Sequence, residues 1–288
     1  MKRILIKNGK YFLFFFVIIF LICLYGCNGS TPVINAFFAN PSAIVAGESS
    51  TLSWTVTDAD TVSIDYGIGT VDLTGITTVN PTTDTTYTLI ATNSAGPVTA
   101  TATVTVVPIE TLTLQPGSEG KDADVWEVNT DINTGNEPIF NIGYSLEKWR
   151  GRAYLEFDLN PNPLPEGAVV VGGDLRLYQY DGTGEDIQIG VYPVTSSWSE
   201  SSIAWDNQPN SSSIAEYTDV FNSGATDVWC IWHVDDLVKG WLDGSINNYG
   251  ILVRPTDESS NDQAAYFRSS DYTEASKHPE LRIFYSIP

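Results

Sequence analysis

Apolar and polar side chains alternate in short runs through residues 31–288, and Gly, Pro, Asn or Asp separates one run from the next. In residues 50–56 (STLSWTV), for example, Leu52, Trp54 and Val56 fall on one side of an extended chain. A period of two indicates a strand with one buried face, whereas a helix would repeat every 3.6 residues. The alternation therefore predicts an all-β fold built from short strands.

The expected strands form two groups along the chain. They are residues 50–56, 61–64, 87–92 and 98–107 in the first group, and 153–159, 169–171, 174–180, 187–192, 249–253, 265–268 and 281–285 in the second. One helix is expected at 235–242, where Val234, Leu237, Val238 and Trp241 recur at helical spacing and Gly244 follows the end. We expect the apolar side of this helix to face the core.

A change in composition near residue 108 separates two domains. Residues 31–107 contain nineteen threonines and ten valines but no Lys, Arg, His or Cys, whereas residues 108–288 hold seven of the eight tryptophans. The strand spacing of the first segment is that of a seven-strand sandwich, and the second has the short strands and loops of a jelly roll. We predict an immunoglobulin-like β-sandwich at 31–107, followed by a larger jelly-roll β-sandwich at 108–288.

The N-terminus has the layout of an export signal. Residues 1–10 carry four bases and no acid, and the apolar run at 11–25 is shorter than the roughly 20 residues that a membrane-spanning helix needs. The run ends in Leu-Tyr-Gly-Cys at 24–27, which resembles the lipobox of bacterial lipoproteins. The resemblance implies a signal peptide at 1–26, lipid attachment at Cys27 and a short tether at 27–30. The alternative is an ordinary secretory signal that contains a cysteine by chance.

This interpretation predicts an exported protein that acyl chains anchor to the bacterial outer membrane or cell surface. Removal of residues 1–26 takes away four bases and no acid, which changes the formal charge from -21 to -25. A surface this acidic excludes nucleic acid as a partner. Cys230 would then be the remaining thiol of the mature chain, and its neighbours Trp229 and Ile231 predict a buried, unreactive side chain.

Short motifs of the first domain resemble those of bacterial immunoglobulin-like and fibronectin-like repeats. They are Leu52-Ser53-Trp54, Thr86-Tyr87-Thr88-Leu89 and the turn at 93–96. The domain lacks the paired cysteines of antibody domains, and its six acids are scattered through turns. The resemblance implies a spacer between the membrane and the second domain, and adhesion by strand addition is the alternative.

The second domain carries a longer series of spaced motifs. These are 115–117 (QPG), 120–122 (GKD), 152–159 (RAYLEFDL), 175–178 (LRLY), 198–200 (WSE), 205–209 (WDNQP), 248–250 (NYG), 267–270 (FRSS) and 279–281 (PEL). Together they resemble the DNRLRE domain family from about residue 114 to residue 285. The resemblance implies a surface-exposed or secreted jelly-roll module, related to carbohydrate-binding modules that include alginate binders. His233 departs from the family pattern, which more often has Asp at that position.

Arginines and aromatic residues repeat on the polar faces of several expected strands of this domain. The residues predicted to bind a ligand are Trp149, Arg152, Tyr154, Arg176, Tyr178, Arg254 and Arg268, and Trp126 is a second candidate for stacking. Flat rings stack on sugar rings, and guanidinium groups pair with carboxylates in two-pronged contacts. We therefore expect a polysaccharide as the partner, either neutral or containing uronate.

The charge of the domain leaves the choice between these ligands open. The arginines favour a uronate, whereas the net charge of -19 over residues 108–288 repels polyanions and favours a neutral chain. The alternative to ligand binding is that the arginines pair across strands with Glu156, Asp158 or Asp271 and neutralise an acidic surface.

The sequence offers one candidate metal site and no candidate catalytic site. Asp122 and Asp271 are expected to be ligands of a structural calcium ion, because related jelly rolls hold one; the acidic turn at 181–186 lacks EF-hand spacing. No Ser-His-Asp set or histidine metal motif is visible, so we do not expect an enzyme. The predicted function is polysaccharide binding by a surface lipoprotein. The alternatives are a polysaccharide lyase or hydrolase, and a structural or adhesion protein that binds no glycan.

Overall fold

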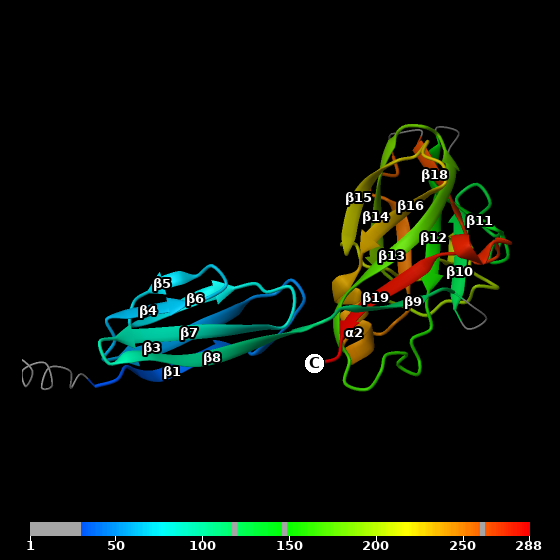
Figure 1. The fold of residues 1–288 in the computed structure, drawn as a ribbon. Coiled ribbons are helices and arrows are strands. Elements are labelled where there is room, and N and C mark those ends of the chain that lie inside the picture. Colours follow the sequence, from blue (N-terminus) through cyan, green and yellow to red (C-terminus); the bar gives the residue numbers. More distant parts are fainter. Residues whose placement is uncertain (1–29, 117–119, 146–148, 260–262) are drawn as a thin grey trace, which may run out of the picture. The chain divides into compact units, whose positions relative to one another are not determined.

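The computed structural model describes residues 30–116, 120–145, 149–259 and 263–288 (Figure 1). It divides into two units, Met1–Pro108 and Ile109–Pro288, which we call unit 1 and unit 2. The proposed signal peptide at 1–26 and the lipid-attachment residue Cys27 lie outside the described residues.

Unit 1 is a sandwich of two sheets. The first sheet has the order β1 (Val33–Asn40), β3 (Ser50–Thr57) and β6 (Thr74–Val79). The second has the order β2 (Ala43–Val45), β8 (Gly96–Val107), β7 (Thr85–Asn93), β4 (Thr61–Ile64) and β5 (Gly69–Val71). Alternate residues of β3 fill the core, as the sequence predicts: Leu52, Trp54 and Val56 are buried, and the Trp54 indole N–H donates to the carbonyl of Asp72 (2.8 Å).

Unit 2 is a larger sandwich. One layer runs β15 (Tyr217–Asn222), β14 (Asp186–Pro193), β17 (Ile251–Pro255), β12 (Trp149–Glu156) and β10 (Lys121–Trp126). The other runs β16 (Val228–His233), β13 (Val169–Gly182), β19 (Glu280–Ser286) and β9 (Glu110–Leu114). Strands β11 (Ile139–Ser145) and β18 (Gln263–Arg268) pair with each other and connect the layers, β11 through β12 and β18 through β13 (Figure 1).

The core of unit 2 lies between these layers. Leu155 and Val253 point into it from the first layer, and Leu177, Trp232 and Phe267 point into it from the second layer and from β18. The Trp232 indole N–H crosses this core to donate to the carbonyl of Ile189 in β14 (3.1 Å), so the largest core side chain leaves no polar atom unpaired.

The α-helix α2 (Asp235–Asp243) packs against β13. The Asp235 carboxylate accepts a hydrogen bond from the N–H of Gly173 (2.8 Å), and a Cβ atom at Gly172 would lie 2.2 Å from the same oxygen. Two glycines in β13 thus allow the helix to approach the strand closely. Gly244 ends the helix in the left-handed region at φ 79°, as the sequence predicts.

The all-β prediction is confirmed, with differences at some element ends. The strands expected at 169–171 and 174–180 are one continuous strand, β13, whose register with β19 shifts between Val170 and Gly172. The strand expected at 153–159 begins at Trp149 and ends at Glu156. Trp126 and Trp149, the candidates for stacking, lie at neighbouring ends of β10 and β12, where Trp126 is opposite Gly151. Cys230 is buried, as expected, and burial raises the pKa of its thiol to about 12.

Candidate functional site

The residues predicted to bind a ligand do not form one patch. Arg152, Tyr154 and Arg254 lie on β12 and β17, on the outer side of the first layer, and Trp149 lies at the start of β12. Arg176 and Tyr178 lie on β13, on the outer side of the second layer, with Arg268 on the neighbouring strand β18. The two groups are therefore separate candidates.

The arginines of the first layer are already paired with an acid. Arg152 donates through Nε and Nη2 to the two carboxylate oxygens of Glu258 (2.7 and 2.6 Å), and Arg254 Nη1 is 3.9 Å from the same carboxylate. Hydrogen bonding to Glu258 raises the pKa of Arg152, although burial opposes this shift. These arginines neutralise Glu258, which is not one of the acids that the sequence suggested as partners.

Tyr154 does not present its ring to a ligand in this structure. Its side chain is 1% exposed, and its hydroxyl donates to Gln208 Oε1 (2.9 Å), which also accepts from Arg152. Trp198 and Trp205, from the segment after β14, cover this face in a second apolar cluster. The alternation correctly predicts that Tyr154 lies on the outer face of β12, but Trp198 and Trp205 cover this face. Tyr154, which the sequence predicts to bind a ligand, is therefore buried in this structure.

Four rings lie side by side on the outer side of the second layer, and we call them the aromatic face: Tyr178 and Tyr180 of β13, Trp229 of β16 and Tyr266 of β18. Tyr178 is paired in register with Trp229, with ring centroids 5.3 Å apart and planes at 82°. Tyr180 is 6.3 Å from Tyr266 at a 36° angle. All four side chains are partly exposed.

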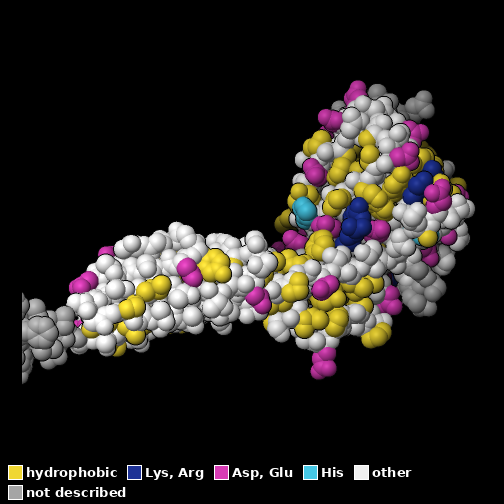
Figure 2. Space-filling model, in the orientation of Figure 1, with side chains coloured by type: hydrophobic (Ala, Val, Ile, Leu, Met, Phe, Trp, Pro, Cys, Tyr) yellow, Lys and Arg dark blue, Asp and Glu magenta, His cyan; other side chains and the backbone are white. Residues whose placement is uncertain are grey.

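Basic side chains surround these rings. The guanidinium of Arg176 lies 4.4 Å from the Trp229 ring, and that of Arg268 lies between Tyr180 (3.7 Å) and Tyr272 (3.9 Å). Lys277 Nζ is 5.3 Å from the Tyr178 ring. On the face of unit 2 shown in Figure 2, Lys and Arg side chains form two groups, with acidic and hydrophobic side chains beside them.

The charges of this face are partly neutralised. Arg176 Nη1 and Arg282 Nη2 both contact Glu280 Oε2 (2.6 and 3.0 Å), and Lys277 pairs with Glu274 (3.2 Å). The Nε atoms of Arg176 and Arg268 are buried and lack a hydrogen-bond partner among the described residues. The sequence argument overlooked Trp229 and Lys277; the alternation in residues 228–233 places Trp229 opposite the core residue Trp232, and this signal could have identified it.

A cavity of about 270 Å³ lies beside Trp126, between β10 and β11. Its lining residues are Asp124, Trp126, Asn129, Ile132, Thr134, Glu137, Ile139 and Asn141. The Trp149 ring, which does not line the cavity, lies 6.3 Å from the Trp126 ring at an angle of 34°. We call this cavity the Asp124 pocket.

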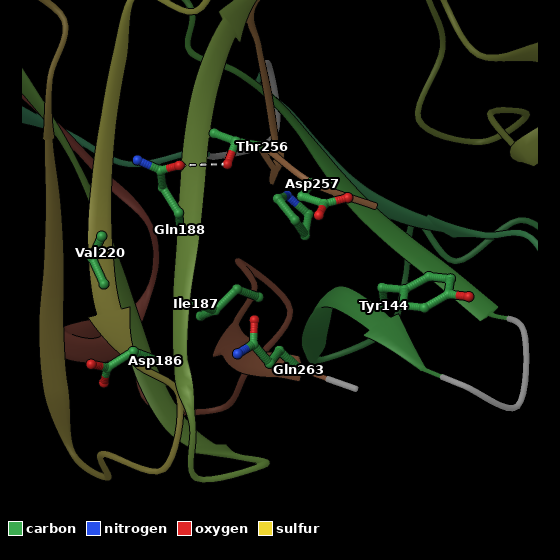
Figure 3. A pocket seen from close by; sticks show the side chains of 9 residues that line it. Tyr144, Asp186, Ile187, Gln188, Val220, Thr256, Asp257 and Gln263 are labelled. Atoms are coloured by element: carbon green, nitrogen blue, oxygen red, sulfur yellow. Dashed lines mark hydrogen bonds between the residues drawn. The ribbon is translucent and has the colours of Figure 1, made fainter. Parts of the chain in front are cut away.

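A second cavity, of about 370 Å³, lies among β11, β14, β15, β17 and β18 (Figure 3). In this view Asp186, Gln188 and Val220 lie on one side and Tyr144 on the other, with Gln263 and Asp257 between them. Three of its polar side chains are already hydrogen-bonded: Thr256 donates to Gln188 Oε1 (2.7 Å), and Asp257 Oδ1 accepts from the N–H and the hydroxyl of Ser259. This leaves the cavity fewer free polar groups for a ligand.

The two acids predicted to bind calcium lie near each other. Both oxygens of Asp122 accept hydrogen bonds from Ser270, from its N–H (2.7 Å) and its hydroxyl (2.6 Å). Burial raises the pKa of Asp122 to about 6, and the carboxylates of Glu200 and Asp271 add to this effect, against the hydrogen bonds from Ser270. Among the described residues, no three or more His, Cys, Asp or Glu side chains form a group that could hold a metal ion. Calcium binding therefore stays a prediction.

The two histidines are held by separate partners. His233 Nδ1 is 2.7 Å from Asp174 on the exposed surface, and His278 Nε2 donates to the carbonyl of Tyr272.

In the part of the chain that the structure describes, no helix is long and apolar enough to cross a membrane.

Solved structures that match this chain include carbohydrate-binding modules and tandem immunoglobulin domains. A solved structure from a study of "the promiscuous specificity of the carbohydrate-binding modules from the beta-sandwich super family" is 16% identical over 91% of this chain and 98% of that chain, with a TM-score of 0.24. Tandem immunoglobulin domains of titin are 13% identical over 46% of this chain and 91% of that chain (TM-score 0.20). A structure of CBM51-2 and INT domains of Clostridium perfringens ZmpB is 11% identical over 82% of this chain and 48% of that chain (TM-score 0.21).

No curated protein matches the chain. The model of carbohydrate-binding module family 96 matches residues 115–285, which is more than half of the sequence and nearly all of unit 2. A module of this kind binds carbohydrate and is not itself a catalytic domain. The chain belongs to carbohydrate-binding module family 96.

Proposed function

We propose that unit 2 binds a polysaccharide chain along the aromatic face. The observation that carries this proposal is the row of partly exposed rings on three neighbouring strands, β16, β13 and β18. Residues two apart in a strand are about 6.7 Å apart, so Tyr178 and Tyr180 present successive rings along one line. Successive sugars of an extended chain can stack on such a row through their apolar faces.

The charges of the face favour a neutral chain. Glu280 pairs with both Arg176 and Arg282 and offsets one of their two positive charges, which weakens their attraction for a ligand carboxylate. Arg268 is held between two rings, and Lys277 is paired with Glu274. Because the domain as a whole is strongly acidic, a uronate chain would be repelled before it reached these groups. Neutral glycans are the proposed ligands, and a uronate-containing chain is the second candidate.

Affinity electrophoresis in gels that contain soluble polysaccharides tests this proposal. Neutral chains (xylan, glucomannan, β-glucan) and alginate are each cast into a gel, and the migration of wild-type protein is compared with Trp229→Ala and Tyr178→Ala. Loss of one stacked ring costs about 1–2 kcal/mol, which corresponds to about a 5–30-fold weaker affinity. Tyr66→Ala removes an exposed tyrosine of unit 1 (68% exposed) and is the matched control.

Two results would contradict the proposal. If both variants are retarded as strongly as the wild-type protein, the aromatic face is not the binding surface. If no polysaccharide retards the wild-type protein, the polysaccharide function itself fails and the structural alternative gains support.

We further propose that the protein is an exported lipoprotein of the outer membrane or cell surface, anchored through Cys27, with unit 1 as an immunoglobulin-like spacer. The lipobox-like sequence at 24–27 and the resemblance of unit 2 to DNRLRE domains support this proposal. Expression of the full chain with labelled palmitate should give a labelled protein in the membrane fraction. Cys27→Ala should remove the label, and a labelled Cys27→Ala protein would contradict the anchor.

A further inference from the structure

The Asp124 pocket is formed by β10, β11 and the segment between them, none of which contributes to the aromatic face. It is a second candidate binding site that borders this face, because Asn141 of its lining is the register partner of Tyr266. Its chemistry differs as well, because it is a cavity rather than a flat surface.

One oxygen of Asp124 lacks a partner in this pocket. The residue is 1% exposed, and its Oδ2 accepts hydrogen bonds from the Trp126 indole N–H (2.5 Å) and from the N–H and Nδ2 of Asn141 (2.9 and 3.0 Å). Its Oδ1 is buried without a hydrogen-bond partner among the described residues. Oδ1 has almost no accessible surface, so a ligand hydroxyl reaches it only when the wall of the pocket moves aside, and a donor that does so recovers the free energy that the unpaired buried oxygen costs.

The other walls of the pocket restrict the ligand. Glu137 adds a second acid, and the lining contains no Lys, Arg or His, so an anionic ligand would be repelled. Asn129 provides an amide group, and the Thr134 hydroxyl, which donates to the carbonyl of Asp124, can still accept a hydrogen bond; Trp126 and Ile132 provide apolar surface. This mixture suits a molecule that has several hydroxyl donors and one apolar face.

The volume of the pocket limits the length of the ligand. Small-molecule sites typically span about 300–1,000 Å³, and the pocket, at about 270 Å³, lies just below that range. A single sugar ring fits this space, whereas an internal stretch of a chain would need a groove open at both ends.

We propose that the Asp124 pocket binds one uncharged sugar residue, at a chain end or on a side branch, with Asp124 Oδ1 accepting a hydrogen bond from a sugar hydroxyl. The proposal rests on the carbohydrate-binding function of the family, but it does not require the aromatic face to bind. The pocket would thus give the module a selective site for one residue beside a less selective surface for chains.

The test uses the full chain and small glycosides that cannot span the aromatic face. The probes are the methyl glycosides of glucose, galactose, mannose, xylose and N-acetylglucosamine, with methyl glucuronide as the anionic counterpart, and the measurement is saturation-transfer NMR followed by calorimetry. Asn129→Ala removes a lining amide of the pocket, and it should weaken binding about 3–10-fold. Asp124→Asn replaces the acceptor and should weaken binding at least about tenfold.

Matched controls separate this site from the aromatic face. Asn136→Ala removes an exposed amide of the same segment that does not line the pocket, and it should bind the glycosides as the wild-type protein does. Trp229→Ala should also leave glycoside binding unchanged, even where it abolishes retention by polysaccharides. If Asp124→Asn fails to fold, Ile132→Trp, at a half-exposed position, blocks the pocket and gives the same readout.

Three outcomes would overturn the proposal. The first is that none of the neutral glycosides binds the wild-type protein. The second is that one binds but Asn129→Ala and the Asp124 or Ile132 variant bind it equally well. The third is that methyl glucuronide binds more tightly than the neutral glycosides. Failure of the aromatic-face proposal looks different, because Trp229→Ala would then leave polysaccharide retention intact.

Discussion

Asp122 should lower the stability of unit 2 as pH rises, whereas most acids in folded proteins raise stability as pH rises. Its pKa is raised from an ordinary value of 3.8 to about 6, chiefly by burial. A carboxyl whose folded pKa is raised binds more protons in the folded state than in the unfolded state between these two values. Stability from this group is therefore present below about pH 4 and is lost as pH rises through about 6.

The size of this effect follows from the pKa shift. A difference of about two units corresponds to about 3 kcal/mol, at about 1.4 kcal/mol for each unit. Asp122→Asn keeps the shape and carries no charge, so it lacks this dependence. Its amide oxygen can still accept from the Ser270 N–H, and its NH₂ group can donate to the Ser270 hydroxyl. The difference in unfolding free energy between wild-type and variant should therefore change by about 3 kcal/mol between about pH 4 and pH 7.5, in favour of the variant at the higher pH.

Urea unfolding followed by tryptophan fluorescence measures this difference, because seven of the eight tryptophans lie in unit 2. Other acids contribute equally to both proteins and cancel in the comparison. Parallel stability curves for the two proteins across this pH range would refute the reasoning. The same experiment tests calcium at this site. A bound ion would stabilise the charged form, so added calcium would raise the stability of the wild-type protein at neutral pH. Asp122→Asn would reduce this increase in stability.

Four further outcomes are expected. Glu280→Gln should lower the free energy of unfolding in urea by about 2 kcal/mol, because it leaves Arg176 and Arg282 without their acid. Glu156→Gln, which breaks a more exposed pair with Lys121, should lower it by less than about 1 kcal/mol. Gly173→Ala should lower stability by about 1–3 kcal/mol, since its Cβ would lie 2.7 Å from Val238 Cγ2. Cys230 should resist alkylation at about pH 8 in the folded protein and react in denaturant, as read by peptide mass spectrometry. Retention by neutral polysaccharides should be unchanged by salt at about 0.05–0.5 M, whereas retention by alginate would weaken if the arginines bound its carboxylates.

The sequence predicts the faces of the strands better than it predicts what covers them. Alternation correctly places Tyr154 and Tyr178 on the outer sides of their strands. Only Tyr178 is partly exposed, because a long segment after β14 folds over Tyr154 and brings Trp198 and Trp205 onto it. A period of two describes one strand and carries no information about a distant loop that packs on it.

The same limit applies to charge pairing and to the pocket. The acid that binds Arg152 and Arg254 lies beyond the end of β17, and the alternation of the strands does not reach it. The unpartnered oxygen of Asp124 depends on where β11 places Asn141, which is set by the pairing of strands that are distant in sequence. Sequence reasoning identified Trp126 and Trp149 as candidates for stacking, but the cavity beside them required the fold.

The arginines of unit 2 have a role that neither a uronate-binding patch nor simple charge neutralisation describes. Each of the four predicted ligand-binding arginines stacks on an aromatic ring: Arg152 on Trp205 (4.7 Å), Arg176 on Trp229 (4.4 Å), Arg254 on Tyr192 (4.1 Å), and Arg268 on Tyr180 and Tyr272. Three of these arginines are also held in place by Glu258 or Glu280. A guanidinium that is fixed by an acid on one side and covers a ring on the other restricts the orientation of that ring. On the proposed aromatic face, Arg176 meets both conditions and holds the plane of Trp229, whereas Arg268 is held between the rings of Tyr180 and Tyr272. A ring that is already fixed would lower the entropy that stacking a sugar costs.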